Sequence, residues 1–284
     1  MPQKRILTMQ DLSCVGRCSL TVALPVLSAY GIETCVLPTA ILSNHTAFPR
    51  WSCLDLSEEA GRIMAAWREN GFRFDGFLTG YLGSPAAIDV ARACLHGCSQ
   101  DGAPIVIDPA FWDYVRLYPA FGRSYVAAMG ELIRSAHILL PNFTEVCFLS
   151  GTEYQSAAPP AYMKEAVVRL SRMTPAAIVM TGAESGGQTG ELIYAGGEFT
   201  EVWTPLLPER FHGTGDLFAA AFTAAYLQSG DLAGACGEAN RLVSESIAAT
   251  ENPCGCGVNF EHALANLRTW PGETPAEHPN PSAG

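Results

Sequence analysis

One short stretch of the sequence combines glycines and an acidic residue in a way that suits phosphoryl transfer. It reads His212-Gly213-Thr214-Gly215-Asp216 and precedes a run of small residues that predicts a helix. Glycines let several backbone N–H groups crowd around one point, and a helix N-terminus adds partial positive charge, so the stretch can form an anion hole. Asp216 could then take the proton of an attacking hydroxyl. The alternative is an ordinary helix cap by Thr214 or Asp216 after a tight turn.

A second candidate site begins where another predicted strand ends, at Asn142-Phe143-Thr144-Glu145. Asn142 and Glu145 are three residues apart and share one face of the helix that the stretch predicts. Oxygen ligands suit Mg²⁺, so Glu145 could hold this ion through water while Asn142 contacts a phosphate oxygen. The alternative is a helix cap with Glu in the first turn, which is a common arrangement.

Polar and aromatic residues after two other predicted strands could bind a small ring. Ser43-Asn44-His45-Thr46 is a dense set of hydrogen-bond donors and acceptors on a predicted loop. Tyr81 could stack on an aromatic ligand. A solvated turn and a core tyrosine are the alternatives for these two features.

Several classes of protein are excluded by the composition of the chain. Of its 284 residues only Lys4 and Lys164 are lysines, and neither lies in a glycine-rich loop, which excludes a P-loop kinase. The formal net charge is −11 and there is no Lys/Arg cluster, so we expect no binding to nucleic acid. No apolar run approaches the roughly 20 residues that span a bilayer, and the N-terminus is not typical of a signal peptide. We therefore expect no membrane association and a cytoplasmic location.

The ten cysteines do not indicate a disulfide scaffold or a zinc site. Many lie in apolar periodic segments and are expected to be reduced thiols of the core. The only tight pair is Cys254-Gly255-Cys256, whose spacing is not the usual one for zinc and which has no second ligand pair.

The residues above are separated by strand-like and helix-like segments that alternate along nearly the whole chain. We expect strands at residues 6–9, 34–37, 76–79, 104–107, 138–140, 177–180, 192–195 and 199–203. We expect helices at residues 19–30, 57–70, 85–98, 124–134, 143–150, 161–173, 217–228, 232–250 and 260–267. Gly196 and Gly197 separate the last two strands, which therefore predict a hairpin.

This alternation predicts an α/β fold in three layers, with a central, mostly parallel sheet between two layers of helices and a small β-hairpin flap. Ligands of such folds bind at the carboxyl ends of the strands, where the polar clusters above are located. We expect one domain over residues 1–270. Residues 271–284 are rich in Pro, Glu, Ser and Gly and are expected to be disordered.

The order of these motifs resembles that of the pyridoxal/pyridoxamine kinases of the ribokinase superfamily, to about Leu267. The Gly-Thr-Gly-Asp element at residues 213–216 and the Asn-x-x-Glu element at residues 142–145 are shared across that superfamily. More specific to the vitamin B6 branch are Ser-Asn-His-Thr at residues 43–46 and Thr-Gly-Tyr-Leu-Gly at residues 79–83. The stretches at residues 6–10 and 108–109 also match.

The resemblance implies a ribokinase-like fold, a homodimer, and a role for each matching residue. Asp216 is similar to the catalytic base of the family, and Gly213, Thr214 and Gly215 to its anion hole. The residues implied for ATP are Asp108, Asn142, Glu145, Thr181 and Thr214, with Glu145 and Asp108 near Mg²⁺ through water. The residues implied for the acceptor are Asp11, Ser43, His45, Thr46 and Tyr81. A requirement for a monovalent cation is left open.

Two departures from the family pattern concern the site itself. Asp11 stands where many members have Ser, and the usual Asp-Pro-Val-Met segment reads Asp108-Pro109-Ala110-Phe111. A carboxylate accepts hydrogen bonds, so Asp11 could favour a substrate with a donor or a cation, such as the aminomethyl group of pyridoxamine. The alternative is that Asp11 caps the turn that follows it.

We therefore expect an ATP-dependent kinase that phosphorylates the 5′-hydroxymethyl group of pyridoxal, pyridoxine or pyridoxamine. The nearest alternative is a hydroxymethylpyrimidine kinase or an enzyme with both activities. A vitamin B6-binding protein without catalysis is a third hypothesis, and the intact Gly213, Gly215 and Asp216 argue against it.

Overall fold

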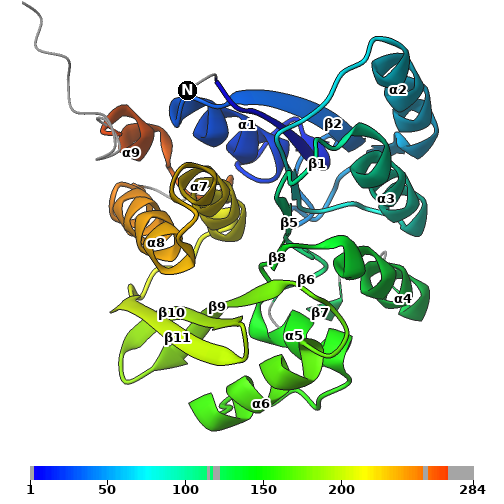
Figure 1. The fold of residues 1–284 in the computed structure, drawn as a ribbon. Coiled ribbons are helices and arrows are strands. Elements are labelled where there is room, and N and C mark those ends of the chain that lie inside the picture. The colour runs from blue at the N-terminus through cyan, green and yellow to red at the C-terminus, as the bar shows by residue number, and fades with distance from the viewer. Residues whose placement is uncertain (1–2, 114–115, 118–121, 252–254, 268–284) are drawn as a thin grey trace, which may run out of the picture.

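The computed structural model describes residues 3–113, 116–117, 122–251 and 255–267, and in this part of the chain the central feature is a nine-stranded sheet (Figure 1). The strand order is β11-β10-β9-β8-β5-β4-β1-β2-β3. The strands from β9 to β2 in this order are parallel, and the antiparallel strands lie at the two edges. The bounds are β1 Arg5–Ser13, β2 Glu33–Leu42, β3 Cys53–Asp55, β4 Gly76–Thr79, β5 Ile105–Ile107, β8 Ile138–Leu139, β9 Ala177–Ser185, β10 Gln188–Ala195 and β11 Glu198–Pro205.

Helices cover both faces of this sheet (Figure 1). One layer contains α1 (Leu20–Ala29), α7 (Thr214–Ser229), α8 (Leu232–Ala248) and α9 (Glu261–Ala265). The other contains α2 (Ser57–Glu69), α3 (Pro85–Cys98), α4 (Arg123–Leu132), α5 (Phe143–Ser150) and α6 (Pro160–Leu170), with a 3₁₀ turn at Ile133–Ser135. Two short strands, β6 (Trp112–Asp113) and β7 (Arg116–Leu117), pair with each other outside the main sheet. No helix in the described ranges is long and apolar enough to cross a membrane.

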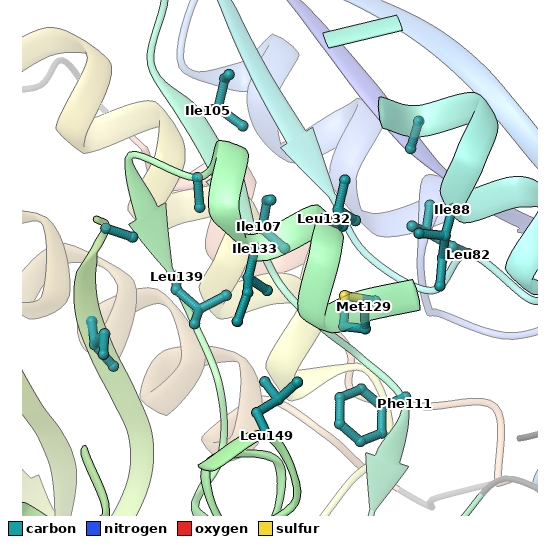
Figure 2. Packing of buried hydrophobic residues seen from close by; sticks show 14 of the residues in the cluster. Leu82, Ile88, Ile105, Ile107, Phe111, Met129, Leu132, Ile133, Leu139 and Leu149 are labelled. Atoms are coloured by element: carbon teal, nitrogen blue, oxygen red, sulfur yellow. The ribbon is translucent and has the colours of Figure 1, made fainter. Parts of the chain in front are cut away.

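The alternation of side chains along the strands builds a separate core under each helix layer. Ile6 of β1 packs in the cluster under α1 and α7, whereas the next residue, Leu7, packs in the cluster on the opposite face. Figure 2 shows part of this second cluster, where Ile107 of β5 lies beside Ile133. Because both faces are covered, the central strands are apolar at nearly every position, and polar side chains gather at their carboxyl ends.

The predicted α/β fold with a mostly parallel sheet is confirmed, and β4, α3 and α5 have the predicted bounds. Five strands are longer than predicted, since β1 continues to Ser13, β2 to Leu42 and β9 to Ser185, while β10 begins at Gln188 and β11 spans Glu198–Pro205. The predicted hairpin forms β10 and β11, and it extends the main sheet through pairing of β10 with β9. The predicted disordered tail lies outside the described residues.

A buried carboxyl group makes stability depend on pH. Glu191 of β10 is 3% exposed, and its Oε2 accepts a 2.7 Å hydrogen bond from Asn240 Nδ2 of α8. Burial raises the pKa of Glu191 from 4.5 to about 8, although the Asn240 bond acts in the opposite direction. Because the folded pKa lies above the unfolded one, the contribution to stability is complete below about pH 4.5 and is lost as the pH rises toward 8.

We expect Glu191→Gln to be more stable than the wild type at pH 8, by on the order of 3 kcal/mol, and similar to it near pH 4.5. The amide stays neutral at every pH and can still accept the hydrogen bond from Asn240. Denaturant unfolding at the two pH values measures the difference. Glu198→Gln, at an exposed position of β11, is the matched control and should change neither value. A Glu191→Gln variant no more stable than the wild type at pH 8 contradicts this interpretation.

Candidate active site

The first turn of α7 has backbone N–H groups that no side chain caps. The N-cap is Gly213, with a φ of 82°, and no described side chain bonds to the end of the helix. The Thr214 hydroxyl donates instead to the Phe211 carbonyl at 3.2 Å. The first helical bond runs from the Leu217 N–H to the Gly213 carbonyl at 2.9 Å. Neither Thr214 nor Asp216 acts as the ordinary cap that was the alternative, so this helix end can receive an anion.

Asp216 lies in this first turn and is half-buried as a residue. Burial raises the pKa of Asp216 to about 7, and the nearby Asp11 carboxyl adds to the rise. The backbone N–H of Ser19 acts against it by stabilising the charged form. A carboxyl group that titrates near neutral pH is suited to act as a general base.

Two further carboxyl groups, those of Asp108 and Glu145, lie near Asp216. Asp108 follows β5, and burial together with the charges of Glu145 and Asp216 raises its pKa well above the ordinary range. Asp108 Oδ1 accepts from the N–H of Ala110, a residue with a φ of 43° that closes this turn. The sheet therefore brings together carboxyl groups that are more than 30 residues apart in the sequence.

The side chain of Glu145 is committed to the backbone. Its Oε1 accepts from the Phe111 N–H and its Oε2 from the Asn142 N–H, both at 3.0 Å. The Asn142 side chain accepts from the Glu145 N–H at 2.9 Å, which completes a capping box for α5. The alternative interpretation of this motif as a helix cap is thus correct, and the cap also fixes the loop after Asp108. Figure 2 shows Phe111 in the core beside this loop, near Met129 of α4.

These acidic residues fit a divalent cation that is held largely by water and by a ligand. Burial raises the pKa of Asp108, and the like charges of Glu145 and Asp216 raise it further; a cation would relieve that repulsion. In the described part of the chain, no group of three or more His, Cys, Asp or Glu side chains is placed to hold a metal ion.

Thr181 lies inside β9, next to the start of α5. An isolated bridge pairs Thr181 with Asn142, and the Thr181 N–H donates to the Pro141 carbonyl at 2.9 Å. The register between β9 and β10 shifts at this point. Two residues predicted to contact ATP are thus side by side, Asn142 just after β8 and Thr181 in the middle of the neighbouring strand β9.

Asp11 is a buried residue within β1, so it does not cap a turn. It is 3% exposed, and its Oδ2 accepts from the Ser13 hydroxyl at 3.0 Å. Its N–H donates to the Tyr81 carbonyl at 3.1 Å, which brings two predicted acceptor residues together. Burial raises the pKa of Asp11, and hydrogen bonds from Ser19 and Ser13 act against that rise.

The predicted acceptor loop divides into an exposed part and a buried part. The Ser43 side chain is exposed, and its hydroxyl closes its own loop by donating to Asn44 Oδ1 and accepting from the Ser52 N–H. His45 is 7% exposed and lies against His212, with 5.3 Å between the ring centroids. Thr46 is half-buried beside it. His45 therefore connects this loop to the stretch that contains Gly213 and Asp216.

Sequence reasoning missed a set of residues around this connection. The loop from Gly16 to Ser19 after β1 contacts both Gly213 and the segment at residues 255–258. The sequence predicts only in general terms that the loop at residues 252–257 lies near an adenine pocket, and it indicates no contacts. The available signals were Gly16, Gly255 and Gly257, which all have positive φ, but glycines alone do not reveal which loops meet.

The model of the phosphomethylpyrimidine kinase family matches residues 26–260. Pyridoxal kinase PdxY of Granulibacter bethesdensis is 31% identical over 242 residues, which cover 80% of this chain and 82% of that protein.

Two crystal structures share both the fold and part of the sequence. A Bacteroides thetaiotaomicron protein crystallised with pyridoxal has a TM-score of 0.88 and 35% identity, covering 93% of this chain and 96% of that one. Pyridoxal kinase from Lactobacillus plantarum has a TM-score of 0.85 and 31% identity, covering 92% of this chain and 97% of that one. Both similarities extend over nearly the whole of each chain.

Proposed function

The chain belongs to the phosphomethylpyrimidine kinase family, and from this premise we propose that it transfers the γ-phosphoryl group of ATP to the 5′-hydroxymethyl group of a vitamin B6 vitamer. As a member of this kinase family it is a phosphotransferase with an alcohol group as acceptor. Pyridoxal, pyridoxine and pyridoxamine are the proposed acceptors.

The observation that carries the proposal is the first turn of α7. Its N–H groups have no side-chain cap, and Asp216 in the same turn has a pKa of about 7. An anion hole and a general base are thus within one helical turn of each other. Phosphoryl transfer needs positioning and charge stabilisation more than covalent chemistry, and this turn supplies both.

In the proposed reaction, Asp216 takes the proton of the 5′-hydroxyl while the oxygen attacks the γ-phosphorus, and the bond from that phosphorus to the β–γ bridging oxygen breaks to release ADP. The backbone N–H groups of Gly213, Thr214 and Gly215 stabilise the charge that develops on the phosphoryl oxygens. Bound Mg²⁺ supplies neutralisation of the β- and γ-phosphate charge. Asp108 would help to hold that ion, and Glu145 would add negative charge nearby while it orients the loop that follows Asp108.

We assign the remaining residues to the two substrates. Asn142, Thr181 and Thr214 contact the nucleotide phosphates. Asp11, Thr46 and Tyr81 surround the acceptor ring, together with the ring face of His45, and Ser43 shapes the loop at its rim. We also propose a single domain over residues 1–270, a homodimer and a cytoplasmic location; light scattering of the purified protein tests the dimer.

The second candidate is phosphorylation of a hydroxymethylpyrimidine, because the matching family model describes phosphomethylpyrimidine kinases. Initial rates of ADP release with the three vitamers and with hydroxymethylpyrimidine separate the two. We expect the highest kcat/KM for a vitamer. A pyrimidine that outperforms every vitamer would replace the first proposal by the second, and tight vitamer binding without ADP release would indicate a binding protein.

The carboxylate of Asp11 is expected to select the vitamer. Asp11→Ser should lower the ratio of kcat/KM for pyridoxamine to that for pyridoxal by roughly tenfold or more, because a hydrogen bond between charged groups contributes about 1.5–3 kcal/mol. Steady-state kinetics with both vitamers give the ratio. Ser13→Ala is the matched variant, since it removes the hydroxyl that donates to Asp11 but keeps the carboxylate. An unchanged ratio in Asp11→Ser refutes this role.

A further inference from the structure

Both ring nitrogens of His45 are engaged by the protein backbone. Nε2 donates to the Gly255 carbonyl at 2.7 Å, and Nδ1 accepts from the Ala47 N–H at 3.3 Å. This pattern requires a neutral imidazole with its proton on Nε2. Burial lowers the pKa of His45, and the neighbouring His212 lowers it further, while the Gly255 carbonyl acts in the opposite direction. The polar atoms of His45 are therefore not available to a substrate, which can contact only the face of the ring.

His45 bonds to the segment at residues 255–258. This segment in turn bonds to Arg17 and His212, which lie next to the anion hole at Gly213. The Cys256 carbonyl accepts from the Arg17 N–H at 2.6 Å, and the Val258 N–H donates to the His212 carbonyl at 3.0 Å. A Cβ on Gly257 would lie 2.9 Å from the Arg17 carbonyl oxygen and 3.0 Å from that of His212. The three backbone segments are thus packed with no space for a side chain between them.

His45 also packs directly against the loops that meet at Gly213. A Cβ on Gly16 would lie 2.3 Å from His45 Cδ2, and a Cβ on Gly213 would lie 2.0 Å from the Arg17 carbonyl oxygen. The His45 ring also contacts the rings of Phe48 and His212, with centroid distances of 4.6 and 5.3 Å. A shift of His45 would therefore displace the Gly16–Arg17 loop and, through it, Gly213.

We infer that His45 is a positioning residue for the anion hole, acting through its bond to Gly255, in addition to presenting a ring face to the acceptor. The inference rests on the proposed kinase function. It assigns an effect on kcat and an effect on the acceptor KM to different parts of the His45 side chain. The Nε2–H group sets the position of Gly213 and governs kcat. The ring face governs the KM of the acceptor. Misplacing catalytic groups by about 1 Å can cost a factor of roughly 100 in rate.

Two substitutions separate these effects. His45→Phe keeps a ring face but removes the donor to Gly255, so kcat should fall by roughly 30- to 100-fold while the acceptor KM stays within about threefold. His45→Gln keeps an N–H donor but removes the ring, so kcat should stay within about fivefold of the wild type while the acceptor KM rises. Steady-state kinetics at saturating ATP and Mg²⁺ measure both constants, and thermal unfolding shows that each variant is folded.

The matched control is His96→Phe, the same change at an exposed position in the last turn of α3, which should alter neither constant. If His45→Phe raises only the acceptor KM, or if His45→Gln loses as much kcat as His45→Phe, the positioning role is overturned although the kinase function stands. If the wild type phosphorylates no vitamer or pyrimidine, the proposed function itself fails, and the inference with it.

Discussion

Asp216→Asn is expected to lower kcat by about a factor of 10³ with little change in the KM of either substrate. The amide has nearly the same shape as the carboxyl group but cannot accept the proton of the acceptor hydroxyl, and a general base contributes roughly 10² to 10⁴ in rate. Initial rates with saturating ATP and vitamer give kcat. Asp231→Asn, at the exposed N-cap of α8, is the same change outside the site and should leave kcat as it is.

The pKa of Asp216 adds a pH dependence to this result. With a pKa of about 7 in the free protein, kcat/KM of the wild type should fall about tenfold per pH unit below 7 and level off above it. The folded pKa lies above the ordinary 3.8, so the contribution of this group to stability is lost as the pH rises from about 4 to 7. Asp216→Asn should therefore unfold no earlier than the wild type at pH 8. A variant that is inactive and also less stable at that pH would contradict the assignment of a base.

Gly213→Ala is expected to lower kcat by about a factor of 100 and to destabilise the protein. The new Cβ would lie 2.0 Å from the Arg17 carbonyl oxygen, which is far inside contact distance, and the φ of 82° is unfavourable for alanine. The Arg17 loop or the helix end must move, and the N–H groups of the anion hole move with it. Rates at saturating substrate measure the first effect, and denaturant unfolding measures the second.

The opposite end of the same helix provides the control. Gly230, at the C-cap of α7, has a φ of 71°, and no atom lies within 4 Å of the position that a Cβ would take there. Gly230→Ala therefore has the conformational strain without the steric clash and should cost about 1 kcal/mol of stability with no change in kcat. Equal kcat for the two alanine variants would show that the close approach at Gly213 is unimportant for catalysis.

The elements that could be predicted from the sequence are those with strong local signals. Helix α3 begins at Pro85 after Ser84, whose side chain accepts from the Ala87 N–H, and these residues indicate a helix start in any context. The sequence predicts that strand β1 ends at Met9, because Gln10 and Asp11 are polar. In the structure the strand continues through them, paired with β2 across a shift in register. Strand β3 has three exposed residues and forms only because β2 provides a partner, so no local pattern indicated it.

Part of the site could be predicted from the sequence, because parallel strands place their carboxyl ends at the same edge of a sheet. Because β1, β4, β5 and β8 are parallel, Tyr81, Asp108 and Asn142 follow their strands at one edge of the sheet, where Asp11 lies near the end of β1. The sequence did not indicate that both nitrogens of His45 are engaged, or that residues 255–258 pack on Arg17. Those contacts join loops more than 200 residues apart, and only the packed structure determines them.

The most direct test of the central claim, that the first turn of α7 transfers a phosphoryl group to a vitamer alcohol, is to identify the product. The wild type is incubated with ATP, Mg²⁺ and each vitamer, and the product is examined by ³¹P NMR and mass spectrometry. We predict a phosphate monoester coupled to the protons of the 5′-methylene group, formed in a one-to-one ratio with ADP and absent in Asp216→Asn. Release of inorganic phosphate without this ester, or an equal yield of ester in Asp216→Asn, would contradict the claim.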